Sequence, residues 1–498
     1  MNVNPITRLD YPDPDVIRVE DTYYMVSTTM HFMPGCEILQ SFDLVHWEHV
    51  TYVYETLDHT DAQQLKSGQN IYGQGMWAAS LRHHEGRFCI CFVANDTRKT
   101  YLYTSEKIDG PWKKQLIEGF YHDGSLLFDE DGRNYIVYGN DEIWITELNE
   151  DLTAPKKDGL HRLLVSDHKN PELGYEGSHI QKINGYYYIF LVHSLRDRWM
   201  RTEACFYSDS LEGEFTGGDV LCDDRGYCGQ GVAQGGIVDT PDGKWYAMLF
   251  QDSGAVGRIP ILLPVTWKDH FPVFGQNGHV PEEIEVHSTR PGYIYQPLVG
   301  SDDFCNGLLP RWQFNHDPDP RYYHLDALQG TYTITTREVC TELTQAVNTL
   351  TQRMSYPSCA AEVTVDASAL KEGDVAGLCA LQGCYAAVGI TKHHGKYEVL
   401  MLDKKEDGIL DMTEGTVVES HQMDFRLEAD FCNMKDEARC YYRVNKGDWL
   451  PIGTVHKLYF KLDHFTGCRF GLFCYAAEKT GGSACFRDFK YYDVDEIS

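Results

Sequence analysis

Basic residues are scarce in this 498-residue sequence, with 44 Lys and Arg against 74 Asp and Glu, and the formal net charge is −30. A surface this acidic repels phosphate backbones and anionic lipids, so we expect neither nucleic acid nor a membrane as a partner. The sequence also lacks any apolar run long enough to span a bilayer. A neutral substrate such as a small oligosaccharide meets none of this repulsion.

The 16 cysteines include no Cys-x-x-Cys pair, and their spacing matches neither a zinc site nor a disulfide framework. The opening Met1-Asn2-Val3-Asn4-Pro5 lacks the basic region and apolar core of a signal peptide. We therefore expect a cytoplasmic protein whose thiols are reduced. Aromatic residues, in contrast, reach 13% of the chain, which suits either strands or the stacking of sugar rings.

A hairpin pattern recurs five times before residue 255, each copy having two apolar runs joined by a tight turn. The turns are Glu20-Asp21, Glu85-Gly86, Asp131-Gly132, Asn184-Gly185 and Asp242-Gly243. Such pairs favour hairpins because both residues tolerate positive φ. The period of about fifty residues is that of a propeller blade, so the sequence predicts an all-β fold with a five-bladed β-propeller. An irregular β-sandwich with similar hairpins is the weaker alternative.

The pattern of prolines and apolar runs changes near residue 300. Residues 253–300 contain several prolines and little hairpin pattern, whereas short alternating runs restart at Ser301, such as TYTITT at 331–336 and YEVLML at 397–402. Short strands with no helical periodicity indicate a β-sandwich. We therefore predict a propeller over residues 1–300 and a sandwich over residues 301–498.

Three acidic residues occupy similar places in their hairpin copies. Asp13, Asp123 and Glu176 lie eight or nine residues before the turn, and Trp77 and Gln234 hold the matching places in the other two copies. The first strand of each propeller blade lines the central axis. These side chains are therefore expected to converge at one end of the channel, with Trp77 as a wall.

Converging carboxylates suit the hydrolysis of a glycosidic bond, which requires a protonated acid and an ionised carboxylate on opposite sides of the sugar. A third negative group raises the pKa of the acid by repulsion and keeps it protonated near neutral pH. Two other uses of such acids are binding of Ca²⁺ and capping of turns. Three acids in matching places favour the catalytic use over turn capping.

At these residues the sequence resembles glycoside hydrolase family 43, and it is close to the β-xylosidases and α-L-arabinofuranosidases with a C-terminal β-sandwich. The opening NPITRLDYPDPDVIRVEDTYYMVS, the HDGS segment at 122–125 and the YEGSH segment at 175–179 carry the resemblance. It implies an inverting reaction in which Asp13 is the general base, Asp123 modulates the pKa of the acid and Glu176 is the general acid. Room for the attacking water then requires roughly 6.5–9.5 Å between the base and the acid.

The resemblance also implies residues that bind the sugar. The stretch GRIPILLPVTW, from Gly257, is similar to a family segment whose arginine binds sugar hydroxyls, which assigns that role to Arg258. Trp77 and Phe32 are expected as apolar walls of the pocket.

The chemistry requires no cofactor, but the resemblance raises the question of calcium. The C-terminal part resembles lectin-like sandwiches that hold a structural Ca²⁺, with Asp303 and Asp488 as candidate ligands. A calcium ion on the propeller axis is not expected, because Cys228 and Ala233 stand where family members place a histidine and thiolate is a poor Ca²⁺ ligand.

We predict an exo-acting hydrolase that releases xylose, arabinofuranose or both from short xylo- or arabino-oligosaccharides. Two alternatives remain open on the sequence alone. One is a retaining propeller enzyme that acts on fructosides, and the other is a non-catalytic propeller that binds carbohydrate.

Overall fold

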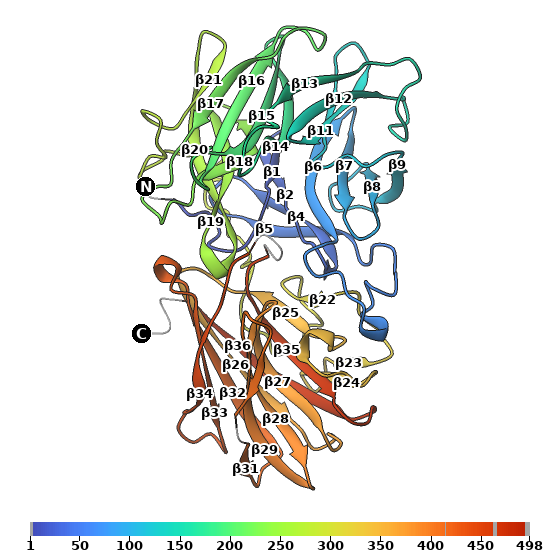
Figure 1. Cartoon of the computed structure of the whole chain (residues 1–498), viewed down its shortest axis with the longest axis vertical. Helices are drawn as coiled ribbons and strands as arrows, with labels where there is room; N and C mark the ends of the chain where they lie inside the picture. The colour runs from blue at the N-terminus through green and yellow to red at the C-terminus, as the bar shows by residue number, and fades with distance from the viewer. Residues whose placement is uncertain (1–2, 414, 462–465, 494–498) are drawn as a thin grey trace.

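The computed structural model describes residues 3–413, 415–461 and 466–493, and strands make up almost all of its regular structure. The N-terminal part is a five-bladed β-propeller and the C-terminal part is a β-sandwich, stacked along the long axis of the molecule (Figure 1). The predicted all-β fold is confirmed. The described helices are the short 3-10 turns η1 (Lys66–Gly68), η2 (Gly254–Val256), η3 (Leu343–Gln345) and η4 (Cys432–Met434), and none of them could cross a membrane.

Each blade is a four-stranded antiparallel sheet whose strands follow one another outward from the axis. Blade 1 contains β1 (Asp15–Val19), β2 (Thr22–Val26), β4 (Gly35–Ser41) and β5 (Glu48–Tyr54). Blade 2 contains β6 (Met76–His84), β7 (Arg87–Ala94), β8 (Lys99–Ser105) and β9 (Lys113–Ile117). Blade 3 contains β10 (Ser125–Phe128), β11 (Asn134–Asn140), β12 (Glu142–Leu148) and β13 (His161–Ser166).

The last two blades are built in the same way. Blade 4 contains β14 (Glu176–Ile183), β15 (Tyr186–Ser194), β16 (Arg201–Ser208) and β17 (Thr216–Leu221). Blade 5 contains β18 (Val232–Asp239), β19 (Trp245–Asp252), β20 (Arg258–Lys268) and β21 (Phe271–Phe274). Middle strands such as β15 are buried along nearly their whole length because blades cover both faces, so they read as continuous apolar runs.

The N-terminal segment closes the ring of blades. The side chain of Asn4 exchanges two hydrogen bonds with the backbone of Leu262 in β20, and the Ile6 N–H donates to the carbonyl of Pro260. The Tyr11 N–H then donates to the carbonyl of Arg258. These bonds bring the residues just before β1 next to blade 5, so the first and last blades meet around one axis.

Two antiparallel sheets form the sandwich. The first contains β3 (Phe32–Met33), β22 (Gln313–Asn315), β25 (Leu350–Arg353), β35 (Arg469–Ala476), β27 (Asp374–Leu381), β28 (Tyr385–His393), β29 (Lys396–Lys404), β30 (Leu410–Met412) and β31 (Thr416–Val418). The second contains β23 (Tyr323–Asp326), β24 (Thr331–Thr335), β36 (Ser483–Asp493), β26 (Ser358–Asp366), β32 (Gln422–Asp430), β33 (Glu437–Arg443) and β34 (Leu450–Lys457). Strand β32 alternates buried and partly exposed residues because one face packs in the core and the other faces solvent.

The propeller and the sandwich share a β-sheet and a hydrophobic core at their junction. Strand β3 leaves blade 1 and pairs with β22, so the propeller donates an edge strand to the sandwich. Ala255, Val256 and Ile259 of blade 5 belong to the hydrophobic core of the sandwich. The last propeller strand ends at Phe274 and β22 begins at Gln313; the predicted boundary near residue 300 lies between them and remains a prediction.

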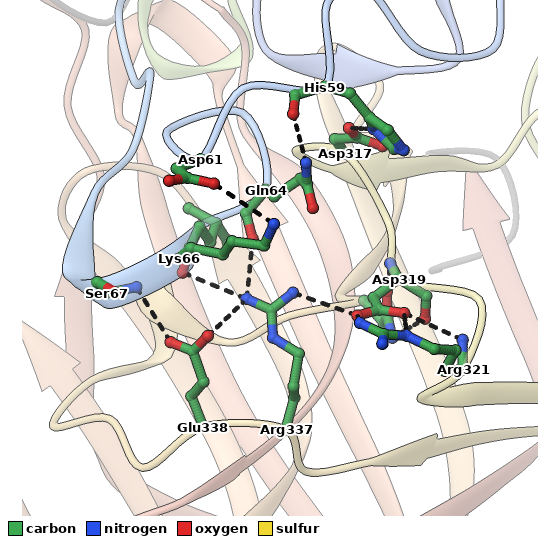
Figure 2. A network of polar contacts seen from close by, with 12 residues as sticks. His59, Asp61, Gln64, Lys66, Ser67, Asp317, Asp319, Arg321, Arg337 and Glu338 are labelled. Carbon is green, nitrogen blue, oxygen red and sulfur yellow. Dashed lines mark hydrogen bonds and ion pairs between the residues drawn. The ribbon is translucent and has the colours of Figure 1, made fainter.

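A polar network ties residues 59–67 of the propeller to the sandwich (Figure 2). Arg337 Nη2 donates to the carbonyl of Gln64 at 2.9 Å and lies 3.1 Å from Glu338. Glu338 in turn accepts a hydrogen bond from the Ser67 N–H, and His59 pairs with Asp317. Together with the shared strand, these contacts fix the sandwich against one side of the propeller.

Candidate active site

Each blade places one residue with positive φ at the start of its inner strand. These residues are Asp13, Ala78, Asp123, Gly177 and Gln234, with φ between 27° and 66°. All five line one small cavity on the propeller axis, together with Ser178 and His179. The chain therefore adopts the same left-handed conformation at the corresponding position of each blade.

This register corrects the one predicted from the sequence. Two-residue turns follow the inner strands of blades 1, 2 and 4, whereas residues 129–133 and 240–244 form longer turns in blades 3 and 5. A constant count back from the glycine therefore lands one residue early in blades 2 and 4. Ala78 and Gly177, not Trp77 and Glu176, are the true equivalents of Asp13 and Asp123.

Asp13 is a buried carboxylate with a donor on each oxygen. Its Oδ1 accepts a hydrogen bond from Arg258 Nη1 at 2.8 Å, and its Oδ2 accepts one from Thr28 Oγ1 at 2.5 Å. The Thr28 hydroxyl is itself fixed because it accepts the Ala78 N–H at 2.9 Å. These two hydrogen bonds hold the Asp13 carboxylate in one orientation, and the predicted binding of sugar hydroxyls by Arg258 stays a prediction.

Asp123 lies on the axis beside Asp13 and is also buried. Its Oδ2 accepts the Gly177 N–H at 2.9 Å, which links blade 3 to blade 4. Burial, together with the neighbouring carboxylates of Glu176 and Asp13, raises the pKa of Asp123 to about 6, although His122 opposes that rise.

Glu176 lies one residue before the left-handed position, and its side chain is 19% exposed compared with 5% for Asp13. Its Oε2 accepts a hydrogen bond from Asn140 Nδ2 at 2.7 Å, at the end of β11. Burial raises the pKa of Glu176, but His122 and the guanidinium groups of Arg201 and Arg258 outweigh burial and lower it overall. The expectation that repulsion raises the pKa of Glu176 is therefore wrong, because the neighbouring cations lower it.

Asp252 bridges two arginines of the site, Arg201 and Arg258. Asp252 Oδ2 accepts a hydrogen bond from Arg201 Nε at 3.0 Å, and its Oδ1 lies 3.3 Å from Arg258 Nε. Both guanidinium groups also lie against the ring of Phe250. This bracket fixes Arg258 while its Nη1 reaches Asp13, so the arginine has little freedom to swing away.

Trp77 and Phe32, the two predicted apolar walls of the sugar pocket, lie in different parts of the structure. Trp77 lies beside the site, with its ring 6.2 Å from that of His122. Phe32 lies in β3 at the junction with the sandwich, is 2% exposed and is covered by the guanidinium of Arg469 at 3.4 Å. The structure therefore brings Trp77 to the carboxylates, whereas Phe32 is packed between the two parts of the molecule.

The predicted calcium ligands lie far along the chain from the propeller strands. Asp302 and Phe489 form an isolated antiparallel β-bridge. Asp303 and Asp488 are the residues next to this bridge on its two chain segments. The Asp303 carboxylate accepts the Cys305 N–H. Within the described residues no third histidine, cysteine or acidic side chain completes a metal-binding group with these two, and their role stays a prediction.

Several residues of the site escaped the sequence analysis. His122 could have been found, because it stands directly before Asp123 in the HDGS segment. Thr28, Asn140 and Arg201 carry no such signal, since each comes from a second or third strand, or from a loop, of a blade and reaches the carboxylates only through the packing of the fold.

Comparison with known proteins matches both parts of the chain. The model of glycosyl hydrolases family 43 matches residues 3–272, and that of the β-xylosidase C-terminal concanavalin A-like domain matches residues 301–492. A β-xylosidase from Formosa agariphila is 26% identical, with 99% of this chain and 89% of the relative covered. A non-reducing end α-L-arabinofuranosidase from Bacteroides ovatus is 25% identical, with 66% of this chain and 63% of the relative covered.

Solved structures agree with these matches. A bifunctional GH43-CE protein from Bacteroides eggerthii is 42% identical over 98% of this chain, with a TM-score of 0.92, and this chain spans 63% of its length. A GH43 glycoside hydrolase engineered to display both endo-xylanase and exo-arabinofuranosidase activity is 27% identical, with a TM-score of 0.86 and 99% of both chains covered. From its propeller to its lectin-like sandwich, the chain belongs to glycoside hydrolase family 43.

Proposed function

We propose that this chain is an inverting exo-glycosidase that releases xylose, arabinofuranose or both from the ends of short xylo- or arabino-oligosaccharides. The observation that carries the proposal is the contrast between two carboxylates of one site. Asp13 lines the axial cavity and is held by Arg258 and Thr28, whereas Glu176 is more exposed to solvent. This contrast supports a division of roles in which Asp13 acts on the attacking water and Glu176 acts on the leaving group.

In the proposed reaction Asp13 removes a proton from the attacking water while Glu176 protonates the leaving oxygen. Arg258 orients Asp13 and, on the proposal, binds sugar hydroxyls with its remaining donors. Asp123 holds the Gly177 N–H and supplies negative charge next to Glu176, which adjusts the proton affinity of the acid. Trp77 provides an apolar wall beside the same pocket.

Cleavage from chain ends is supported by contacts of the sandwich close to the base. The Gly467 N–H donates to Asp10 Oδ2 at 2.7 Å, and the Asp10 Oδ1 accepts the Arg258 N–H at 2.7 Å. The same Arg258 holds Asp13 through its side chain. On the proposal, this sandwich segment limits the room for a long polysaccharide on that side of the site.

The names of the relatives support the choice of sugar, because they include a β-xylosidase and an α-L-arabinofuranosidase. Xylose and arabinofuranose present similar hydroxyl groups to one pocket. A cytoplasmic location is part of the proposal, and it is consistent with the structure, in which all 16 cysteines are free thiols.

Substrate assays with NMR detection test the proposal. Aryl β-D-xyloside and aryl α-L-arabinofuranoside are incubated with the enzyme, and the anomer formed first is recorded. We expect turnover of at least one substrate with inverted configuration. Retention would point to the alternative mechanism that uses a nucleophile. Hydrolysis of a fructoside with neither aryl glycoside turned over would make the sugar assignment wrong, and binding without hydrolysis would leave only a carbohydrate-binding propeller.

A further inference from the structure

His122 lies between two of the three carboxylates. Its Nε2 is 3.5 Å from Glu176 Oε2 and 3.6 Å from Asp123 Oδ2, just beyond ordinary hydrogen-bonding distance. The Nε2 atom is buried and, among the described residues, has no hydrogen-bond partner. A shift of a few tenths of an ångström would therefore bond it to either acid.

The charges around His122 come from several blades. The carboxylates of Asp123, Glu176 and Asp13 act on it from blades 3, 4 and 1, while the guanidinium groups of Arg201 and Arg258 act on Glu176 from blades 4 and 5. Burial lowers the pKa of His122, but the three carboxylates outweigh burial and raise it to about 9. At neutral pH His122 is therefore protonated, and the lowered pKa of Glu176 leaves that carboxyl ionised.

This distribution leaves the proposed acid without its proton. General acid catalysis requires a proton on Glu176 when the glycosidic bond breaks. The amide of Asn140, which is hydrogen-bonded to Glu176 Oε2, is not acidic, whereas His122 Nε2, 3.5 Å from the same oxygen, carries an acidic proton. A neutral sugar that covers the site removes water from both groups, and loss of solvent favours the neutral pair over the charged pair.

Building on the function proposed above, we propose that His122 is a positioning residue that supplies the proton delivered by Glu176. The Nε2–H bond breaks and an Oε2–H bond forms on Glu176. That proton then moves to the leaving oxygen as its bond to the anomeric carbon breaks, while the attacking water gives its own proton to Asp13. After the products leave, Asp13 loses its proton to solvent and His122 regains one, so each turnover consumes one water.

The test compares His122→Gln with wild type, because glutamine keeps an N–H donor near Nε2 but cannot supply an acidic proton. The pH dependence of kcat/KM is measured on a glycoside with a poor alkyl leaving group and on one with dinitrophenolate, which needs no protonation. We expect the alkaline limb on the alkyl glycoside to move down by about one pH unit or more. At pH 8 we expect a loss of about tenfold or more on the alkyl glycoside and little loss on the activated one.

His84→Gln is the matched control, because His84 lines the opposite end of the propeller axis, and it should leave both profiles unchanged. An unchanged alkaline limb, or an equal loss on both substrates, would show that His122 has only a structural role. Nitrogen NMR of His122 provides a readout that needs no substrate: a neutral ring at pH 7 in the empty enzyme would overturn the proposal. If instead the ring is charged and no glycoside is cleaved by wild type, the proposed function fails rather than the protonation of His122.

Discussion

At the scale of single residues, the partners of each acid distinguish the two proposed roles. Asp13 has a cationic donor and a hydroxyl donor on its two oxygens, which fix its orientation for the proposed role of base. Glu176 is bonded to the neutral amide of Asn140 and lies beside His122. His122 can return a proton to Glu176 after each turnover. The arginine beside Asp13 cannot do this, because a guanidinium group does not give up its proton in a protein.

A series of leaving groups should therefore separate Asp13→Asn from Glu176→Gln. The base acts on every substrate, so we expect Asp13→Asn to lower kcat/KM by roughly 10²–10⁴-fold for both alkyl and dinitrophenyl glycosides. Glu176→Gln should cause a similar loss on the alkyl glycoside but only about tenfold or less on the dinitrophenyl one. Glu85→Gln, at an exposed turn of blade 2, is the control for changing a carboxylate to an amide. Equal losses for the two variants on both substrates would contradict the assigned roles.

At the scale of elements, the repeated hairpins could be predicted because turn chemistry and blade period are local properties of the sequence. The exact register of the acids could not, because it depends on the number of residues in each turn. Asn184-Gly185 closes a two-residue turn, whereas Gly132 lies within the five-residue turn 129–133. Arg201 could not be predicted for another reason. Its hydrogen bond to Asp252 forms only when blades 4 and 5 pack together.

Gly177 is the element-scale feature that sets the site, and Gly177→Ala tests it. Its φ is +66°, and an added Cβ would lie 2.7 Å from Gln234 Cγ, while its N–H holds Asp123. We expect a loss of about 1 kcal/mol in unfolding free energy from backbone strain, and in addition a clear loss of kcat as Asp123 is displaced. Gly185→Ala, with φ +86° and open space in the turn of the same strand pair, should lose similar stability but keep its activity. If both variants keep full activity, the Gly177 contact does not position Asp123.

At the scale of the whole molecule, the sandwich could be predicted from its alternating strands, but its union with the propeller could not. The pairing of β3 with the sandwich and the burial of Phe32 depend on how the two parts pack against each other. A local sequence pattern does not encode that packing. Arg353 of β25 shows the same coupling. It reaches into blade 1, where it lies 2.8 Å from Glu37 and donates through Nε to the carbonyl of Asp10.

The pair of Arg353 and Glu37 makes stability depend on pH in a defined direction. Burial raises the pKa of Glu37, but Arg353 and His49 outweigh burial and lower it to about 2. Because this folded-state pKa lies below the unfolded value, the stabilisation is present above the unfolded pKa and is lost as pH falls toward about 2. Arg353→Met reverses the sign, since a buried carboxylate without its cation prefers the proton.

We therefore expect Arg353→Met to lower the unfolding free energy by about 3–5 kcal/mol at pH 7.5, and by less at pH 5, where Glu37 can take up a proton. Adding Glu37→Gln should recover much of the loss at pH 7.5, because no charge is then left buried. Arg290→Met is the control: its pair with Asp21 is exposed, so its effect should stay below about 1 kcal/mol. Denaturant unfolding at both pH values measures all four proteins. A double variant no more stable than Arg353→Met would mean that packing of the arginine, not its charge, joins the sandwich to the propeller.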